Sequence, residues 1–195
     1  MNDAVPPTYV ARANVLEHEA IWRLTPDALE LQGGPTAGPD AVMRFPYRDI
    51  VGVRLSYAPS RVDSARYRCD LTMRSGGTIA ILSTHYAGVA DFEDRAATYA
   101  PFVRALIAKV AVANPSARFR SGKNPIVYSA EYLFLLAMVA LLVYVLSITG
   151  FMPLSDSSWA KLFIVIGFIP LLIVYTRKNW PRGFKPDAIP TDVLP

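Results

Sequence analysis

The chain has 195 residues, of which 52% are hydrophobic and 18% charged, and its formal net charge is +4 at pH 7. A charged fraction below the usual quarter of residues argues against a disordered chain or one that wraps nucleic acid, so no nucleic-acid partner is expected. The length suits one ordinary domain plus a small addition, and the composition favours a protein that lies partly in lipid.

Residues 1–18 are expected to be an N-terminal extension. Met1 to Arg12 lack the basic and apolar regions of a cleavable signal peptide. The single cysteine, Cys69, cannot form an intramolecular disulfide, so the sequence does not indicate a disulfide scaffold.

Residues 19–122 predict a cytoplasmic domain of short strands followed by one helix. Strands are expected at 20–24, 28–31, 42–45, 51–57, 67–74 and 78–83. Turn residues separate two pairs of them, Thr-Pro-Asp at 25–27 and Ser-Gly-Gly at 75–77. Apolar and polar residues alternate along the longest strands, which predicts one buried and one solvated face. On this pattern Cys69 is a buried apolar residue rather than a nucleophile.

A helix is expected next, because apolar residues recur every three or four positions from Phe92 to Val110. Its apolar face is expected to cover the sheet. Pro101 leaves two alternatives: the helix bends there, or one helix ends near Tyr99 and a second begins with Pro101. Asn114 and the proline after it end the helix in both cases.

The order of these elements resembles the bacterial pleckstrin-homology-like (PH-like) domain. The resemblance is carried by LTPDAL at 24–29, FPYRDIVGV at 45–53 and FVRAL at 102–106. It implies an α+β fold, a small antiparallel β-sandwich or barrel of two orthogonal sheets capped by the C-terminal helix. One strand of that fold is unaccounted for, so either the sheet is incomplete or residues 12–17 supply it. The resemblance implies binding of lipid headgroups or protein segments, and no catalysis.

Residues 128–176 predict a transmembrane α-helical hairpin, with helices at about 132–151 and 159–175. No charged side chain occurs from Tyr132 to Ser155, and 20 helical residues span a hydrocarbon core of about 30 Å. The second helix contains Gly167 and Pro170, which membrane helices tolerate. Glu131 is expected at the membrane boundary rather than in an intramembrane functional site.

Basic residues flank the predicted hairpin on its outer ends, whereas the connecting side holds only Lys161, near the start of the second helix. The positive-inside rule therefore predicts a multi-pass protein with both termini cytoplasmic, and the Arg-rich composition suggests a bacterial inner membrane. Aromatic residues expected to anchor the helices at the membrane interface are Tyr132, Trp159, Tyr175 and Trp180.

Residues 177–195 form a basic tail with frequent prolines, which is expected to run extended along the domain or a partner, or to be disordered. No catalytic motif, cofactor motif or metal-ligand set emerges. The only two imidazoles, His18 and His85, lie 67 positions apart, and Gly33-Gly34 opens no helix as a phosphate loop would.

An arginine-rich stretch at 44–74 supplies the candidate contacts to lipid or a partner, which are Arg54, Arg61, Arg66 and Arg68. The leading hypothesis is a non-enzymatic binding or scaffold protein at the inner membrane, with a protein partner or further copies of itself and with membrane lipids around it. The alternative is a sensor of anionic lipid headgroups. A third reading, a lipid-directed enzyme, requires Asp70, Tyr47 and His85 to converge.

Overall fold

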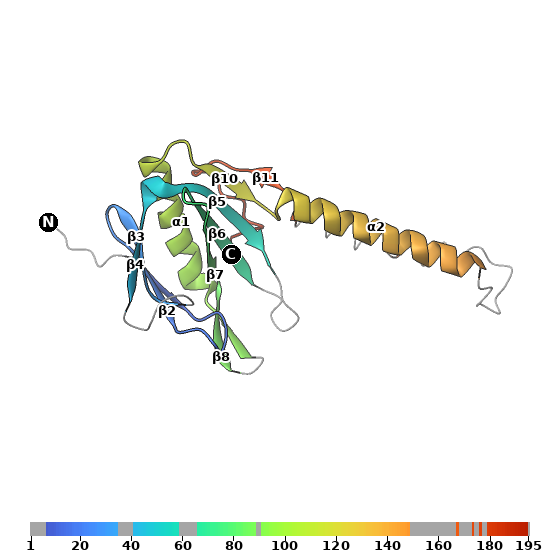
Figure 1. The fold of residues 1–195 in the computed structure, drawn as a ribbon, viewed down its shortest axis with the longest axis horizontal. Coiled ribbons are helices and arrows are strands. Elements are labelled where there is room, and N and C mark those ends of the chain that lie inside the picture. Colours follow the sequence, from blue (N-terminus) through green and yellow to red (C-terminus); the bar gives the residue numbers. More distant parts are fainter. Residues whose placement is uncertain are drawn as a thin grey trace. The chain divides into compact units, whose positions relative to one another are not determined.

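A computed structural model describes residues 7–34, 41–58, 66–88, 91–148, 167, 173, 176 and 179–194 of the chain. The chain divides into two compact units. One comprises Met1–Gly122 and Arg182–Pro195, and the other comprises Lys123–Pro181. We refer to them as the sheet unit and the helix unit. The predicted α+β class is confirmed (Figure 1).

Within its described residues, the sheet unit contains two larger sheets and one hairpin. The four-stranded sheet has the order β1-β2-β3-β4, from β1 (Thr8–Ala11), β2 (Ala20–Leu24), β3 (Ala28–Gly33) and β4 (Val42–Pro46). The five-stranded sheet has the order β11-β10-β5-β6-β7, from β5 (Ile50–Tyr57), β6 (Tyr67–Met73), β7 (Thr78–Leu82), β10 (Arg118–Ser121) and β11 (Arg182–Gly183). β8 (Thr84–Gly88) pairs with β9 (Asp91–Asp94), and the 3-10 helix η1 (Tyr47–Asp49) joins β4 to β5.

Turn chemistry explains why the six predicted strands are confirmed. At the β2–β3 turn the Thr25 hydroxyl donates to the carbonyl of Ala28 at 2.7 Å and accepts from its N–H at 3.2 Å. At the β6–β7 turn Gly76 has φ of 93°, a left-handed conformation that glycine adopts without a steric cost. Each turn therefore stabilises the register of the strands on either side.

The strand β1 corrects the expectation for the N-terminal region. It runs along β2 from Thr8 opposite Arg23 to Ala11 opposite Ala20, inside the segment expected to be an extension. Residues 12–17, the expected source of a further strand, instead form a turn. The guanidinium of Arg12 donates to three backbone carbonyls in this turn, those of residues 14, 15 and 17, and these bonds hold the chain in a bend.

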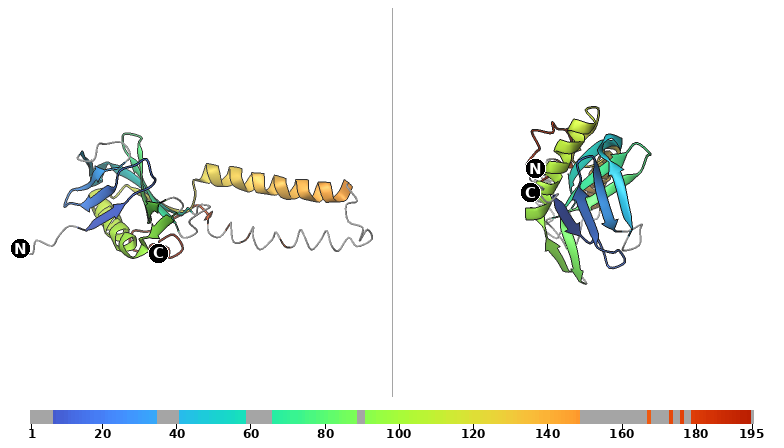
Figure 2. Two further views of the ribbon diagram at one scale, coloured as in Figure 1. Left: turned by 90° about the horizontal axis from the view of Figure 1, so that it is seen from below. Right: turned by 90° about the vertical axis from the view of Figure 1, so that its left-hand side faces the viewer.

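One continuous helix, α1 (Ala96–Ala113), passes through Pro101, so the alternative of two separate helices is wrong. It begins later than the apolar pattern suggested, because Phe92 lies in β9 and packs on Tyr86 of β8. The Asp94 carboxylate accepts a hydrogen bond from the N–H of Ala96 at 2.9 Å, which satisfies one of the open amides at the helix start. Figure 2 shows α1 lying alongside the strands of the sheet unit.

The apolar face of α1 forms the core with the inner faces of both larger sheets. Its buried residues are Tyr99, Ala100, Phe102, Val103, Leu106, Ile107 and Val110. Tyr9 of β1 contacts the rings of Tyr99 and Phe102, with centroids 5.6 Å away in each case. Cys69 is fully buried in the same cluster, as predicted, and burial raises the pKa of its thiol.

From Arg182 onward, the C-terminal tail belongs to the sheet unit. β11 pairs antiparallel with β10, which itself pairs parallel with β5, and Val193 and Leu194 are buried in the core. Only Arg182–Gly183 of the tail runs as a strand, and residues 186–187 and 191–192 form turns. The parallel pair departs from the antiparallel prediction. This parallel pairing is possible because α1 lies between β5 and β10 in the sequence. The helix brings the chain back to the end at which β5 begins.

In the helix unit, α2 (Pro125–Ile148) begins seven positions before the expected start at Tyr132. Asn124 caps it, because its side-chain oxygen accepts from the N–H of Ile126 at 3.0 Å, and Pro125 takes the first helical position. α2 is long and apolar enough to cross a membrane. α1 meets the same criteria, but its apolar face forms the core of the sheet unit.

Most of the second predicted membrane helix, 159–175, lies outside the described residues. Gly167 and Ile173 are described, and both are helical. Of the predicted anchors, Trp159 and Tyr175 also lie outside. Tyr132 and Trp180 are described, and each ring contacts Tyr128, at centroid distances of 6.0 and 5.9 Å.

Candidate functional site

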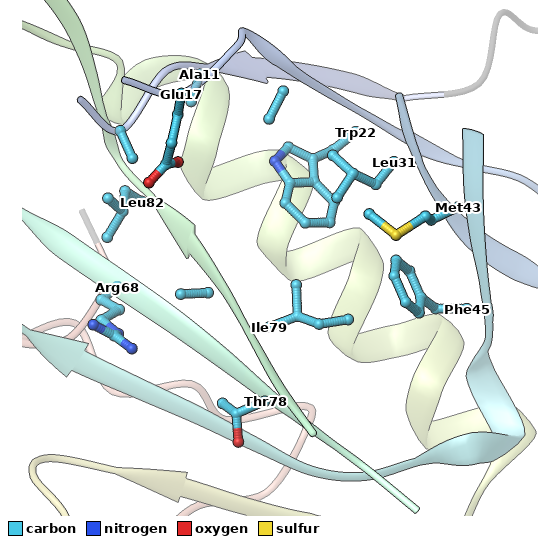
Figure 3. Close-up of a pocket in the computed structure, with 13 residues that line it drawn as sticks. Ala11, Glu17, Trp22, Leu31, Met43, Phe45, Arg68, Thr78, Ile79 and Leu82 are labelled. Atoms are coloured by element: carbon cyan, nitrogen blue, oxygen red, sulfur yellow. The ribbon is translucent and has the colours of Figure 1, made fainter. Parts of the chain in front are cut away.

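A cavity of about 520 Å³ opens between the free edges of the two larger sheets. We call it the edge groove. Its apolar wall consists of Trp22, Leu31, Met43 and Phe45 from the four-stranded sheet and Ile79 from β7. In Figure 3 the Trp22, Met43 and Phe45 side chains gather along one part of the cavity, with Arg68 and Thr78 in another.

Strand pairing explains why these side chains meet. Trp22, Leu31 and Met43 lie directly opposite one another on β2, β3 and β4, so they form one row across the inner face of the sheet. Phe45 lies in the next row, opposite the fully buried Leu29. Met43 and Phe45 stand on the last strand of this sheet and are only partly buried. The core therefore extends to the sheet edge and continues into the groove.

The backbone of β7 presents unused hydrogen-bonding groups to the groove. Two backbone hydrogen bonds flank β7. The Ser83 N–H donates to the Tyr67 carbonyl (3.0 Å), and the Met73 N–H donates to the Gly77 carbonyl (2.8 Å). The odd-numbered residues of β7 therefore direct their backbone N–H and carbonyl groups toward β6. In an antiparallel pair the alternate residues direct both backbone groups the other way. The N–H and carbonyl groups of Thr78 and Ala80 therefore point away from β6, at the free edge.

The same parity applies to β4 on the opposite side of the groove. The Gly33 N–H donates to the Ala41 carbonyl at 3.2 Å, so residues 41, 43 and 45 direct their backbone N–H and carbonyl groups toward β3. The backbone groups of Val42 and Arg44 consequently point away from β3. Two strand edges that no described strand pairs with thus flank an apolar cavity.

Charged groups lie at the margins of the edge groove. Glu17 and Arg68 both line it. The guanidinium of Arg68 is 2.7 Å from the carboxylate of Asp70, its neighbour two positions along β6. Arg68 therefore extends over the outer face of the sheet, toward Asp70.

The four arginines predicted as contacts do not form one cluster. Arg54 on β5 and Arg68 on β6 lie on the same face of adjacent strands, in the register Arg54 opposite Asp70. Arg66 precedes β6, and its Nε is buried without a hydrogen-bond partner among the described atoms. Arg61 lies outside the described residues. Of the three that the structure describes, Arg54 and Arg68 thus lie on one sheet face.

Two arginines that the sequence analysis did not select as contacts complete a second candidate surface. Arg118 and Arg120 of β10 lie opposite Gly52 and Arg54 of β5, so Arg54, Arg118 and Arg120 share one face. They line a shallow pocket of about 410 Å³, which we call the arginine pocket. The alternation Arg-Phe-Arg-Ser at 118–121 was the signal for it, because it predicts a strand with both arginines on one face.

Electrostatics in the arginine pocket disfavour the charged form of Arg54. Burial lowers the pKa of Arg54, and the positive charge of Arg120 lowers it further, whereas Asp70 raises it. Among the described residues that line this pocket, none is acidic.

The residues proposed for the enzymatic reading have separate surroundings. The Tyr47 hydroxyl donates to the Thr25 carbonyl at 2.9 Å, and Asp70 is paired with Arg68. His85 lies opposite Glu93 in the β8–β9 hairpin. No group of three or more possible metal ligands occurs in the part of the chain that the structure describes.

Comparisons with models of protein families, with curated proteins and with solved structures found nothing that matches this chain.

Proposed function

We propose that the protein is a membrane-anchored, non-enzymatic binding protein that captures an extended segment of a partner protein in the edge groove. The observation that carries this proposal is the edge of β7, which pairs with no strand among the described residues and lies beside an apolar cavity. An added strand obtains main-chain hydrogen bonds from Thr78 and Ala80, and a large apolar side chain of that strand fills the space beside Trp22 and Phe45.

We also propose that the sheet unit is a PH-like domain. Four consecutive strands in one sheet, three consecutive strands in the next and a helix that fills the core support this assignment. The β8–β9 hairpin, β10 and β11 are then additions to that framework. β10 occupies the edge of β5, and β7 and β4 are the end strands of the two sheets that lie beside the edge groove.

The membrane anchor is a helical hairpin in this proposal. Lys123 N–H donates to the Asn179 carbonyl at 3.2 Å, so the helix unit begins and ends at one place. Once α2 crosses a membrane, the chain has to cross it again before Asn179, and the apolar residues 159–175 serve for that crossing. Both termini then lie on the same side.

In this proposal that side is the cytoplasm of a bacterial inner membrane, and the distribution of basic residues supports the cytoplasmic orientation. Arg118, Arg120 and Lys123 precede α2, and four further basic residues follow position 176. On the connecting side the sole basic residue is Lys161, near the start of the second apolar segment. The ion pair between Lys123 and Glu131, at 2.6 Å, suits a helix start at the membrane boundary.

The test uses the full-length protein in lipid nanodiscs and a library of random 12-residue peptides. Selected peptides are expected to carry large apolar residues in an extended pattern. Ala80→Pro removes an outward N–H without removing a bond to β6, so it is expected to weaken peptide binding by about tenfold or more. Thr78→Pro is a second variant of the same kind.

The matched controls are Ala80→Ser and Thr78→Ser, which keep the N–H and should bind as the unchanged protein does. Peptides that bind the proline variants equally well would overturn the proposal. Dimerisation of the chain through β7 would also overturn it. Light scattering would then show that the unchanged protein is a dimer and the Ala80→Pro variant a monomer.

A further inference from the structure

The edge groove has two ends of different chemistry. Phe45 lies at one end, in the strand row that contains Leu24 and Leu29, and the row of Trp22 comes next. Beyond Trp22 the β1–β2 pair ends, and the turn between these strands also borders the groove. We call this part the acidic end, and its lining residues are Ala11, Ala13, Glu17 and Ala20.

The turn at the acidic end holds Glu17 in place. The Arg12 guanidinium donates to the Glu17 carbonyl at 2.9 Å, and the Asn14 side-chain amide donates to the Glu17 carboxylate at 2.5 Å. The carboxylate therefore has a defined position beside the groove before any partner binds.

The negative charge of Glu17 is not balanced by an ion pair in the described part of the chain. Arg68 also lines the groove, but its guanidinium pairs with Asp70 at 2.7 Å. Figure 3 shows Leu82 between the Glu17 and Arg68 side chains. Glu17 is partly buried beside apolar groups, where a charge attracts an opposite charge more strongly than it does in open water.

Small side chains leave room next to this carboxylate. Ala11, Ala13 and Ala20 each contribute only a methyl group to the lining. Lysine and arginine have apolar stems that pack on such a surface while the charged group extends to a polar partner. A large apolar side chain at this position would instead cover the carboxylate without pairing it, which is costly.

Strand geometry sets the distance between the two ends. Ala20 and Trp22 are two positions apart on β2 and both line the groove, so they are separated by about 7 Å. A strand that pairs with β7 directs every second side chain to the same face. A side chain beside Glu17 is thus two or four positions from one beside Trp22 and Phe45.

We propose that Glu17 makes the edge groove specific for partner segments with a lysine or arginine two or four positions from a large apolar residue. This inference rests on the proposed capture of an extended segment and names the chemistry of that segment.

The experiment repeats the selection of random peptides with the full-length protein in nanodiscs and with its Glu17→Gln variant. Peptides selected by the unchanged protein are expected to be enriched in lysine or arginine at this spacing, and those selected by Glu17→Gln are not. Circular dichroism verifies that the variant is folded.

A double-mutant cycle then uses the most enriched peptide and a version of it with glutamine in place of the basic residue. Fluorescence anisotropy should show about fivefold weaker binding after either change alone, and no further loss when both are combined. A merely structural role of Glu17 would weaken both peptides equally and leave their ratio unchanged.

Glu19→Gln is the matched control, because Glu19 is exposed and is not among the residues that line the groove. It removes the same charge two positions away and should leave binding unchanged. Glu17→Lys is expected to reverse the preference, so that a peptide with glutamate in place of the basic residue binds better than the original.

Three results would overturn this inference and leave the capture of a segment in place. They are selected peptides without basic enrichment, a ratio between the two peptides that Glu17→Gln does not change, and an equal loss in Glu19→Gln. Failure of the proposed function is distinct, because then no peptide is selected or the Ala80→Pro variant binds the peptides as well as the unchanged protein does.

Discussion

α1 and α2 are both apolar helices long enough to cross a membrane, yet they have opposite surroundings. The protein buries 39% of the 18-residue apolar stretch Ala96–Ala113 in α1, but only 6% of the stretch Pro125–Leu142 in α2. The apolar residues of α1 follow one face and contact both larger sheets. Those of α2 surround the helix, and Leu133, Phe134 and Leu141 are each more than half exposed. Composition alone thus does not separate a core helix from a membrane helix, whereas the distribution of polar residues around the helix does.

The largest expected effect tests the α1 side of this comparison. Leu106→Ala removes a fully buried side chain from the core and should lower the free energy of unfolding of the sheet unit by about 2–5 kcal/mol. Denaturant unfolding of the full-length protein in detergent, followed by near-ultraviolet circular dichroism, measures it. Leu136→Ala in α2 is the control and should leave this transition unchanged. Equal effects of the two variants would contradict the difference in surroundings.

A smaller effect is expected when a charge is placed in α2. Leu136→Arg should raise the free energy of membrane insertion by about 2.5–3.5 kcal/mol, because a guanidinium near the helix centre is costly in hydrocarbon. Alkaline carbonate extraction should then release more of the protein from membranes.

Val112→Arg is the matched change in α1, because Val112 is 84% exposed and points away from the core. It should alter neither extraction nor stability. An α2 variant that stays in the membrane pellet as fully as the unchanged protein would show that α2 does not cross the membrane.

The smallest effect concerns the polar atom that α1 places in the core. The Tyr99 hydroxyl is buried without a hydrogen-bond partner among the described atoms, and burial raises its pKa above the ordinary value of 10.0. Tyr99→Phe should therefore increase the free energy of unfolding by about 1–3 kcal/mol at neutral pH.

The advantage of Tyr99→Phe should grow above pH 10. In that range the unfolded chain loses the Tyr99 proton and the folded chain keeps it, so this group makes the native protein less stable as pH rises. Unfolding measured at pH 7 and pH 10.5 gives both values. A lower stability of the variant at both pH values would show that the hydroxyl has a stabilising role.

The candidate surfaces were only partly predictable from local patterns. Arg54 and Arg68 were identified because they lie in the arginine-rich stretch at 44–74, but Arg118 and Arg120 counted only among the basic residues that flank the predicted membrane hairpin. Their place beside Arg54 depends on a parallel pairing between β10 and β5, which are more than 60 positions apart. The edge groove depends in the same way on which strands end each sheet.

Local chemistry along the chain determined much of this protein: the hairpin turns at 25–27 and 75–77, the alternation that buries Cys69, and a helix apolar on all sides after residue 125. These features rest on contacts between near neighbours, which periodicity and turn residues encode. Only the tertiary structure decided that Thr8–Ala11 joins β2, that the tail returns to bury Val193 and Leu194, and that β4 and β7 keep free edges. Those outcomes depend on pairing between distant segments, where hydrogen bonds and buried area across the whole fold select the partner.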